Sequence, residues 1–245
     1  MARLLPLCLA LALLLPAATS AQSSQLRVFA AASLTEVFPR IDRRPQYQFA
    51  GSDQLAFQIQ QGARIDVFAA ASPKYPEQLY RQGLVEKPIP FATNTLVLIV
   101  PRSNPGRIRS VLDLAKPGVK VVVGDAGVPV GAYTRTVLSN LGISAAVLKN
   151  VVSQETDVKG VLGKVLLGEA DAGFVYATDV KPVLRRVGVI RIRESAQPHV
   201  VYEVAVVENA PHLQAAHAFV TRLIRPAAQR ELVRSGFGRK PKPAA

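Results

Sequence analysis

Two serines follow short predicted strands at points where a bound anion could be held. Ser33 comes after the apolar run Leu26–Ala31, and Ser52 comes after Tyr47–Ala50. A helix that starts after a strand presents free backbone N–H groups and the positive end of its dipole, which together favour an anion. Serine hydroxyls at such starts could add donors. The alternative is that each serine only caps its helix, with Ser33 and Glu36 forming a capping box.

Two further segments could supply neutral hydrogen-bond donors. The loop Gly124–Gly131 follows the predicted strand Val119–Val123 and carries few polar side chains, so it would offer backbone N–H groups. Tyr176 ends the apolar run Ala172–Tyr176 and could offer its hydroxyl. The alternative for Tyr176 is a core tyrosine whose hydroxyl is satisfied within the protein. If these groups bind a ligand, we expect an anion that is held by neutral hydrogen-bond donors and not by a charged side chain.

Motifs for other chemistry are missing from the sequence. No G-x-G-x-x-G, G-x-x-x-x-G-K-[ST], G-x-S-x-G or H-E-x-x-H occurs, so the usual nucleotide loops, the serine hydrolase turn and the zinc helix have no candidate. The three histidines are His199, His212 and His217, and the last two fall on a predicted surface helix. With Cys8 as the one cysteine, neither a disulfide framework nor a Cys/His metal site is expected.

The elements that would position these groups alternate along the chain. Strands are predicted at 26–31, 47–50, 65–70, 95–100, 119–123, 172–176, 189–192 and 200–207. Helices are predicted after Ser33 and at 51–62, 72–83, 110–115, 131–140, 157–167 and, as a pair divided near Pro226, at 211–236. Such alternation predicts an α/β fold with mostly parallel sheets covered by helices on both faces. Ligands of these sheets bind beyond the carboxyl ends of the strands, where the serines fall.

Composition narrows the function classes. The chain has 245 residues, 49% of them hydrophobic, which excludes a disordered protein. Its formal net charge of +13 raises nucleic acid or an anionic membrane as a partner. Aromatic residues are only 6% with no Trp, which is a poor platform for stacking bases. The basic, proline-rich tail 239–245 is expected to fray.

The N-terminus predicts export from the cytoplasm. Residues 1–21 combine Arg3, an apolar run from Leu4 to Pro16 and small residues at the end, which is the pattern of a cleavable signal peptide. The run is shorter than the roughly 20 residues that span a membrane. An uncleaved N-terminal anchor is the alternative. Cleavage after Ser20 or Ala21 would remove Cys8, which fits an oxidising compartment such as the periplasm.

Several segments resemble the periplasmic molybdate-binding proteins of ABC importers. The match extends over about residues 26–238. The segments that carry it are Phe29–Thr35 (FAAASLT), Phe49–Ser52 (FAGS), Ile65–Ser72 (IDVFAAAS), Val123–Asp125 (VGD), Val128–Tyr133 (VPVGAY), Glu155–Gly160 (ETDVKG), Gly173–Asp179 (GFVYATD) and Tyr202–Val207 (YEVAVV).

The resemblance implies a type II periplasmic binding fold. This fold consists of two α/β lobes that are joined by two crossover strands, with the ligand cleft between the lobes. Residues 22–93 and 200–245 would form the first lobe, and residues 94–199 would form the second. The crossovers would lie near Ala92–Thr95 and Gln197–Val201.

The resemblance also implies a set of oxyanion ligands. The family's motifs place them at the hydroxyls of Ser33, Ser52 and Tyr176 and at the backbone N–H groups of Val130 and Val158. The ligand would be molybdate or tungstate, held through its oxygens with no protein atom on the metal. No cofactor, enzymatic activity or nucleic acid is expected, and the protein would be a monomer that delivers its ligand to the membrane permease of an ABC importer. A binding protein for another tetrahedral oxyanion, such as sulfate, is the alternative, followed by an enzyme on the same fold.

The sequence departs from the family pattern near the predicted site. The segment between Ser33 and Ser52 and the loop Asp125–Val128 are both shorter than the family's. Asp53 stands where small hydroxyl residues are common. A carboxylate beside an anion is unfavourable unless it points away or caps its helix.

Overall fold

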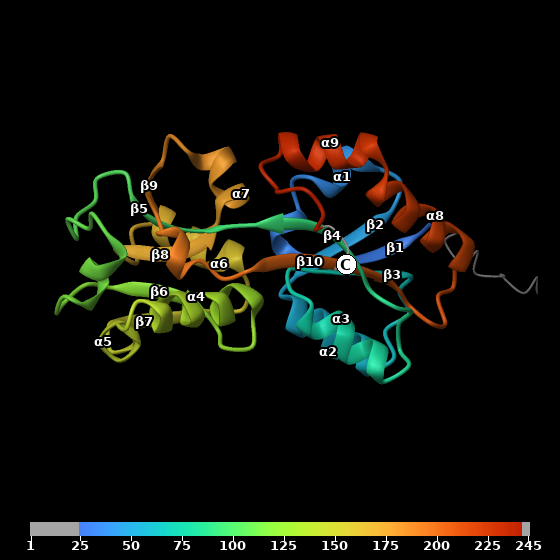
Figure 1. Ribbon diagram of the computed structural model, residues 1–245, viewed down its shortest axis with the longest axis horizontal. Coiled ribbons are helices and arrows are strands. Elements are labelled where there is room, and N and C mark those ends of the chain that lie inside the picture. The colour runs from blue at the N-terminus through green and yellow to red at the C-terminus, as the bar shows by residue number, and fades with distance from the viewer. Residues whose placement is uncertain (1–24, 242–245) are drawn as a thin grey trace, which may run out of the picture.

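The chain forms two five-stranded sheets, each in its own lobe (Figure 1). The computed structural model describes residues 25–241, so the predicted signal peptide, Cys8 and the end of the basic tail lie outside the described residues. The first sheet has the order β2-β1-β3-β10-β4, and the second has the order β7-β6-β8-β5-β9. The strands are β1 (Arg27–Ala31), β2 (Gln46–Ala50), β3 (Val67–Ala70), β4 (Ile89–Asn94), β5 (Leu96–Pro101), β6 (Val121–Gly124), β7 (Val151–Glu155), β8 (Ala172–Tyr176), β9 (Val187–Arg191) and β10 (Val200–Val206).

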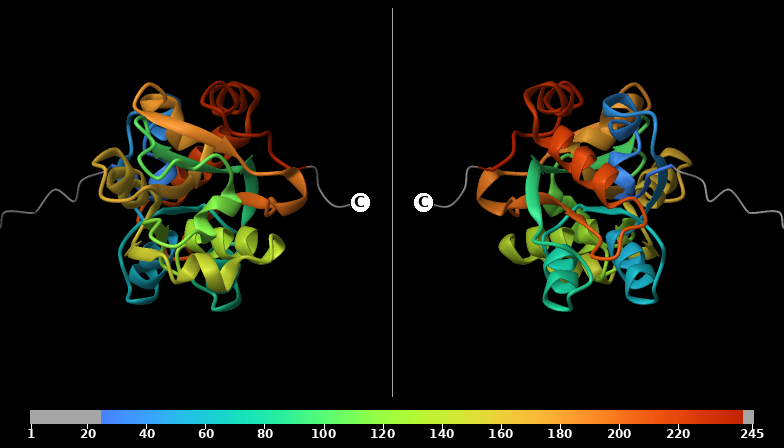
Figure 2. Two further views of the ribbon diagram at one scale, coloured as in Figure 1. Left: turned by 90° about the vertical axis from the view of Figure 1, so that its left-hand side faces the viewer. Right: turned by 90° about the vertical axis from the view of Figure 1, so that its right-hand side faces the viewer.

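Helices lie on both sides of the strands, as the end-on views show (Figure 2). They are α1 (Phe38–Ile41), α2 (Ser52–Gln60), α3 (Lys74–Arg81), α4 (Pro129–Asn140), α5 (Ser144–Leu148), α6 (Val158–Leu166), α7 (Ala177–Val180), α8 (Leu213–Ile224) and α9 (Pro226–Arg234). Within residues 25–241, every helix is too short or too polar to span a membrane.

Two inner strands of the first sheet, β1 and β3, are buried on both faces because they are apolar at successive positions. Phe29 and Phe68 pack with Leu55 and Leu79 of α2 and α3 in one hydrophobic cluster. Their strand neighbours, such as Val28, belong to a second cluster that includes side chains of α8 and α9 and extends into the other lobe. Successive strand side chains point to opposite faces, so an unbroken apolar run places a core on each side.

The prediction of mostly parallel sheets is wrong for half of the strand pairings in residues 25–241. β1 runs parallel to β2 and β3, and β6 runs parallel to β7 and β8. By contrast, β10 runs antiparallel to β3 and β4, and β5 runs antiparallel to β8 and β9. These two strands begin where the chain arrives from the other lobe, and that direction of entry is opposite to the one that a βαβ unit produces.

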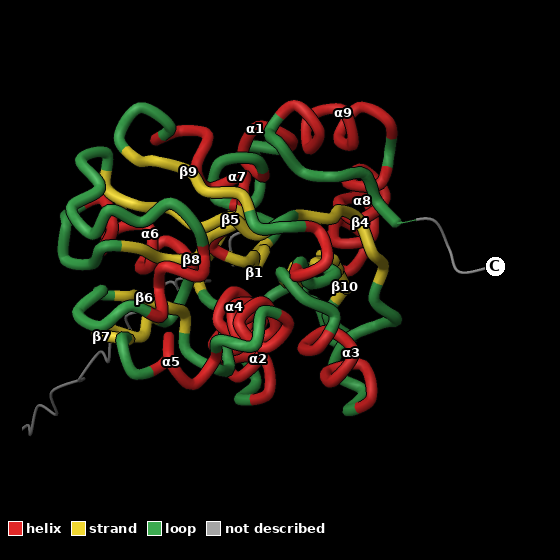
Figure 3. Tube along the Cα trace, turned by 60° about the vertical axis from the view of Figure 1, so that its left-hand side comes forward, coloured by secondary structure: helices red, strands yellow, loops and turns green. Residues whose placement is uncertain are grey.

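Two segments of chain connect the lobes. β4 ends at Asn94 and β5 begins at Leu96, so the first passage is a single residue long. The chain returns between β9 and β10, and the amide of Gln197 there makes two hydrogen bonds to the backbone of Leu96, of 3.1 and 2.8 Å. The two passages therefore lie side by side (Figure 3). Lobe boundaries at 93/94 and 199/200 stay a prediction.

Candidate anion-binding site

The five residues predicted to bind an oxyanion line one small cavity, of about 10 Å³. Ser33 and Ser52 come from the first lobe, whereas Val130, Val158 and Tyr176 come from the second. The rest of the lining is Ala, Gly, Val, Pro and one acidic residue, Asp157, with no Lys, Arg or His. The geometry brings these residues together; that they bind an anion stays a prediction.

Ser33 lies in a short 3-10 helix, Ala32–Leu34, directly after β1. The N-cap of this helix is Ala31 and not Ser33, so the predicted capping box with Glu36 is wrong. The Ser33 Oγ atom instead lies 2.8 Å from the hydroxyl of Tyr202, which is distant in sequence. The serine is therefore held by the sheet and is only 5% exposed.

Ser52 is the first residue of α2, and Gly51 occupies the N-cap position. The backbone N–H of Ala71, which follows β3, donates to Ser52 Oγ over 3.1 Å. The alternative of a capping serine is wrong, because Gly51 is the N-cap and the Ser52 side chain bonds to Ala71 of another segment. Since Oγ accepts from the protein, its own proton is free to be donated into the cavity.

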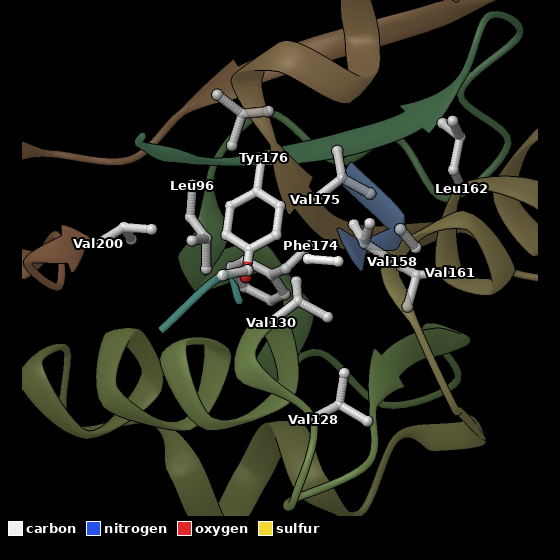
Figure 4. Close-up of a cluster of buried hydrophobic side chains, with 14 of the residues drawn as sticks. Leu96, Val128, Val130, Val158, Val161, Leu162, Phe174, Val175, Tyr176 and Val200 are labelled. Atoms are coloured by element: carbon white, nitrogen blue, oxygen red, sulfur yellow. The ribbon is translucent and has the colours of Figure 1, made fainter. Parts of the chain in front are cut away.

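Tyr176 ends β8 and is 2% exposed. Its hydroxyl is buried without a hydrogen-bond partner among the described residues, so the alternative of a satisfied core tyrosine is wrong. In Figure 4 the ring points toward Val130, with the hydroxyl oxygen at the end nearest that residue. Burial raises the pKa of this hydroxyl well above its ordinary value, so it keeps its proton. The hydroxyl is thus a donor that a ligand in the cavity could use.

Val130 belongs to the first turn of α4, which begins at Pro129, two residues earlier than predicted. Pro129 has no N–H, and the N–H of Ala132 already bonds to the carbonyl of Val128. The N–H groups of Val130 and Gly131 are therefore the ones left over at this helix start. A Cβ atom at Gly131 would overlap the carbonyl oxygens of Gly124 and Asp125, so glycine allows the helix to start against the end of β6.

Val158 opens α6, and the residue before it decides which N–H is available. The Asp157 carboxylate accepts hydrogen bonds from the N–H groups of Lys159, over 2.7 Å, and Gly160, over 3.0 Å. The N–H of Val161 bonds to the carbonyl of Asp157. This cap uses two of the free groups of the first turn and leaves that of Val158. The preceding strand, β7, was not predicted.

Asp53 does not line the cavity, although it follows Ser52 directly. A Cβ atom at Gly127 would lie 3.6 Å from its Oδ2 atom and 3.7 Å from the hydroxyl of Tyr75, so the carboxyl group points toward the loop before α4. Burial raises the pKa of Asp53, and the nearby Asp125 acts in the same direction. The carboxyl group is therefore turned toward the other lobe rather than into the site.

Contacts between the lobes beside the cavity include two that involve loops of the second lobe. The Tyr75 hydroxyl, from α3, donates a hydrogen bond to the carbonyl of Gly127 in the second lobe. At Gly51, a Cβ atom would overlap the carbonyl oxygen of Thr156, which follows β7. Backbone therefore meets backbone next to Ser52, and the cavity is enclosed by parts of both lobes.

Sequence reasoning assigned no role to Tyr202 or Asn94. The Tyr202 hydroxyl contacts Ser33, and the side-chain amide of Asn94 donates to Tyr202 over 3.4 Å. Tyr202 stands in one of the segments that carry the family resemblance, which was a usable signal. Asn94 had no signal, because its partners are 84 and 108 residues away in sequence.

Taken together, the cavity offers hydrogen-bond donors and no counter-charge. Three hydroxyls and the residues at two helix starts line the same small cavity. Charge-assisted hydrogen bonds to an anion are about twice as strong as neutral ones, so a few neutral donors can hold an oxyanion.

Comparisons with known proteins agree with this chemistry. The model of a family described as bacterial extracellular solute-binding protein matches residues 26–238. The molybdate-binding protein ModA of Mycobacterium tuberculosis H37Rv is 38% identical over 234 residues, covering 91% of this chain and 88% of the relative.

Two solved structures have a similar fold. The periplasmic molybdate-binding protein of Azotobacter vinelandii has a TM-score of 0.78 at 20% identity, covering 89% of this chain and 100% of that one. The sulfate-binding protein SubI of Mycobacterium tuberculosis has a TM-score of 0.74 at 18% identity, covering 89% and 88%. At these identities the likeness establishes the fold alone, which two proteins named for different anions share. The predicted two-lobe α/β fold is confirmed.

Proposed function

Because the chain belongs to the bacterial extracellular solute-binding family, together with the molybdate-binding proteins ModA, we propose that it captures molybdate in the periplasm. The observation that carries the proposal is the unpartnered hydroxyl of Tyr176, which lines the cavity with two serines whose protons can face inward. Tungstate, another tetrahedral dianion of nearly the same size, would use the same donors. The anion's oxygens would meet the protein, and no side chain would bind the metal.

Neutral donors suit a protein that must release what it binds. A buried lysine or arginine would add a strong attraction to a dianion and leave an uncompensated buried charge after release. Neutral hydroxyl and N–H groups cost less free energy than a buried charge when they are left without the anion. The second part of the proposal is that the loaded protein delivers its anion to the membrane permease of an ABC importer and acts as a monomer.

The protein itself carries out no reaction in this proposal. Within residues 25–241, the hydroxyls of Ser33 and Ser52 bond to Tyr202 and to the Ala71 N–H, and neither bonds to a His, Asp or Glu that could serve as a general base. The nucleophile-and-base pair that an enzyme on this fold would need is not built around either serine.

A calorimetric panel tests the proposal on the protein without its first 21 residues. Molybdate, tungstate, sulfate and phosphate are titrated separately, with thermal unfolding as a second readout. We expect tight binding of molybdate and tungstate and a matching rise in melting temperature, since a ligand of the native state stabilises it by mass action. Tight sulfate binding without molybdate binding would instead assign the other tetrahedral anion. Binding of none of the four would contradict the proposal.

A further inference from the structure

A series of buried polar side chains leads away from the cavity through Ser33. The Ser33 Oγ atom lies 2.8 Å from the Tyr202 hydroxyl, and the Asn94 Nδ2 atom lies 3.4 Å from that hydroxyl. The same Nδ2 donates to the Thr178 hydroxyl over 2.9 Å. All four residues are less than 9% exposed. The series connects the site to the last residue of β4 and to α7 of the second lobe.

The orientation of the Asn94 amide is fixed by its own backbone neighbour. The Thr95 N–H donates to Asn94 Oδ1 over 2.9 Å, so the oxygen must lie on that side. The NH₂ group then faces Tyr202 and Thr178, and it can only donate.

The direction of the next hydrogen bond follows from counting protons. The Tyr202 hydroxyl has two partners among the described residues, Ser33 and Asn94. Asn94 Nδ2 cannot accept, so the Tyr202 proton has Ser33 Oγ as its acceptor. Burial raises the pKa of Tyr202 well above its ordinary value, and the hydroxyl therefore keeps that proton. Ser33 receives a proton from the protein and retains its own for the cavity.

We propose that Tyr202 and Asn94 are positioning residues that fix the Ser33 hydroxyl as a donor to the bound oxyanion. The inference rests on the proposed function and adds the residues that set its donor geometry. Without the incoming proton, the Ser33 hydroxyl can rotate and present a lone pair to the cavity, which repels an anion. Ser52 has the same arrangement in simpler form, since the Ala71 N–H donates to Ser52 Oγ as the Tyr202 hydroxyl donates to Ser33 Oγ.

Tyr202→Phe separates the hydroxyl from the ring. The ring packs at 5.4 to 6.0 Å, centroid to centroid, against Phe91, Tyr176 and Phe237, and phenylalanine keeps that packing. Tyr47→Phe is the matched control. It also removes a tyrosine hydroxyl donor, here a half-buried one that bonds to the Asp42 carbonyl, and Tyr47 does not line the cavity.

A double-mutant cycle tests the inference by molybdate calorimetry on the wild type, Tyr202→Phe, Ser33→Ala and the double variant. We expect Tyr202→Phe to weaken binding about tenfold, the equivalent of one hydrogen bond. In the Ser33→Ala background the same change should have little further effect, because Tyr202 acts through that serine. Tyr47→Phe should leave affinity unchanged.

Each other outcome overturns a distinct statement. A wild type that binds no molybdate overturns the proposed function and the positioning role with it. A wild type that binds, with Tyr202→Phe and Ser33→Ala acting independently, overturns the positioning role alone, since a merely structural effect would not depend on Ser33. Unchanged affinity in Tyr202→Phe does the same. If Tyr202→Phe fails to fold, Asn94→Ala in the same cycle gives the same test.

Discussion

Three hydroxyl groups in the cavity differ in what they contact before any anion arrives. Those of Ser33 and Ser52 are engaged by Tyr202 and by the Ala71 N–H, whereas that of Tyr176 is buried without a partner among the described residues. Each arrangement leaves a proton for the cavity, but only Tyr176 leaves a buried donor unsatisfied. An unsatisfied buried hydroxyl costs the folded protein stability, so Tyr176 lowers the stability of the ligand-free protein.

Tyr176→Phe should change affinity and stability in opposite directions. Phenylalanine removes the unsatisfied hydroxyl. The free energy of unfolding of the ligand-free variant should therefore stay the same or rise by up to about 1 kcal/mol, and its unfolding temperature should not fall. Molybdate binding should weaken by about 1 to 3 kcal/mol, because the anion loses a donor in an enclosed site. Thermal unfolding without ligand and calorimetry with ligand check the two effects. A loss of stability with unchanged affinity would mean that the hydroxyl serves the core.

At the scale of elements, the start of α4 is the most tightly fitted of the donor-bearing turns. Gly131 lies against the end of β6, where no side chain fits. Gly163, inside α6, offers a contrast, because a Cβ atom there would meet nothing within 4 Å. The two glycines separate the effect of a close approach from that of glycine in a helix.

Gly131→Ala should push the start of α4 away from β6 and move the Val130 N–H out of position. We expect molybdate affinity to fall at least tenfold and stability to fall by about 1 to 3 kcal/mol, which is typical of overpacking. Gly163→Ala should keep affinity and raise stability by about 0.5 to 1 kcal/mol, because alanine favours the helix. Equal effects of the two substitutions in denaturant unfolding and calorimetry would contradict the role given to Gly131.

Local signals predicted most elements, and their failures have physical reasons. Ser-Pro, Asp157 and the closing glycines placed helix ends near their observed positions. β4 was missed because Pro90 argues against a strand, yet β4 is an edge strand, where a missing N–H costs little. β7 is another edge strand with a half-exposed pattern, and α5 is only five residues long.

The site was predictable where a donor belongs to a local element and unpredictable where it depends on tertiary partners. A helix start that follows a strand can be predicted from the local sequence, because an apolar run is followed by a residue that favours a helix start. The accepting role of Ser33 does not, since its partner Tyr202 is 169 residues away. Val130 and Val158 were assigned through the family resemblance, because a valine's side chain says nothing about its N–H.

At the scale of the whole molecule, the net charge of +13 has no counterpart inside the cavity. The positive residues therefore act from the surface, where they can attract anions over roughly a Debye length. Steering of this kind affects arrival rather than retention.

Stopped-flow binding of molybdate at increasing salt concentration should separate the effect of surface charge on association from its effect on dissociation. The association rate constant should fall severalfold between low and high ionic strength, and the dissociation rate constant should stay nearly constant. Tyrosine fluorescence is the available intrinsic signal, because the sequence has six Tyr and no Trp. A dissociation rate that rises with salt would indicate a charged group in the site.

The buried Glu203 of β10 should make stability depend on pH. Burial, and secondarily Glu77, raises its pKa to about 7 from an ordinary value of 4.5. Since the neutral form is favoured in the folded state, its stabilising contribution is complete below pH 4.5 and is lost as pH rises through 7.

Glu203→Gln should therefore flatten the pH profile of stability. Between pH 5 and 8 the wild type should lose about 1 to 3 kcal/mol relative to the variant in denaturant unfolding. The exposed Glu208→Gln is the control and should follow the wild type. Parallel profiles for Glu203→Gln and the wild type would contradict the burial effect.

The close approach of Gly51 to the Thr156 carbonyl limits how near the two lobes can lie beside the cavity. Since no side chain would fit between the two backbone segments there, we expect little further closure around a smaller anion. An anion that fills the space between the lobes would contact donors from both lobes at once. A smaller anion would leave a gap on one side and lose the contacts with the donors of that lobe. Ligand size would thus be selected by a steric limit on the approach of the lobes rather than by repulsion. A methyl group added at Gly51 would hold the lobes further apart and widen the space between them.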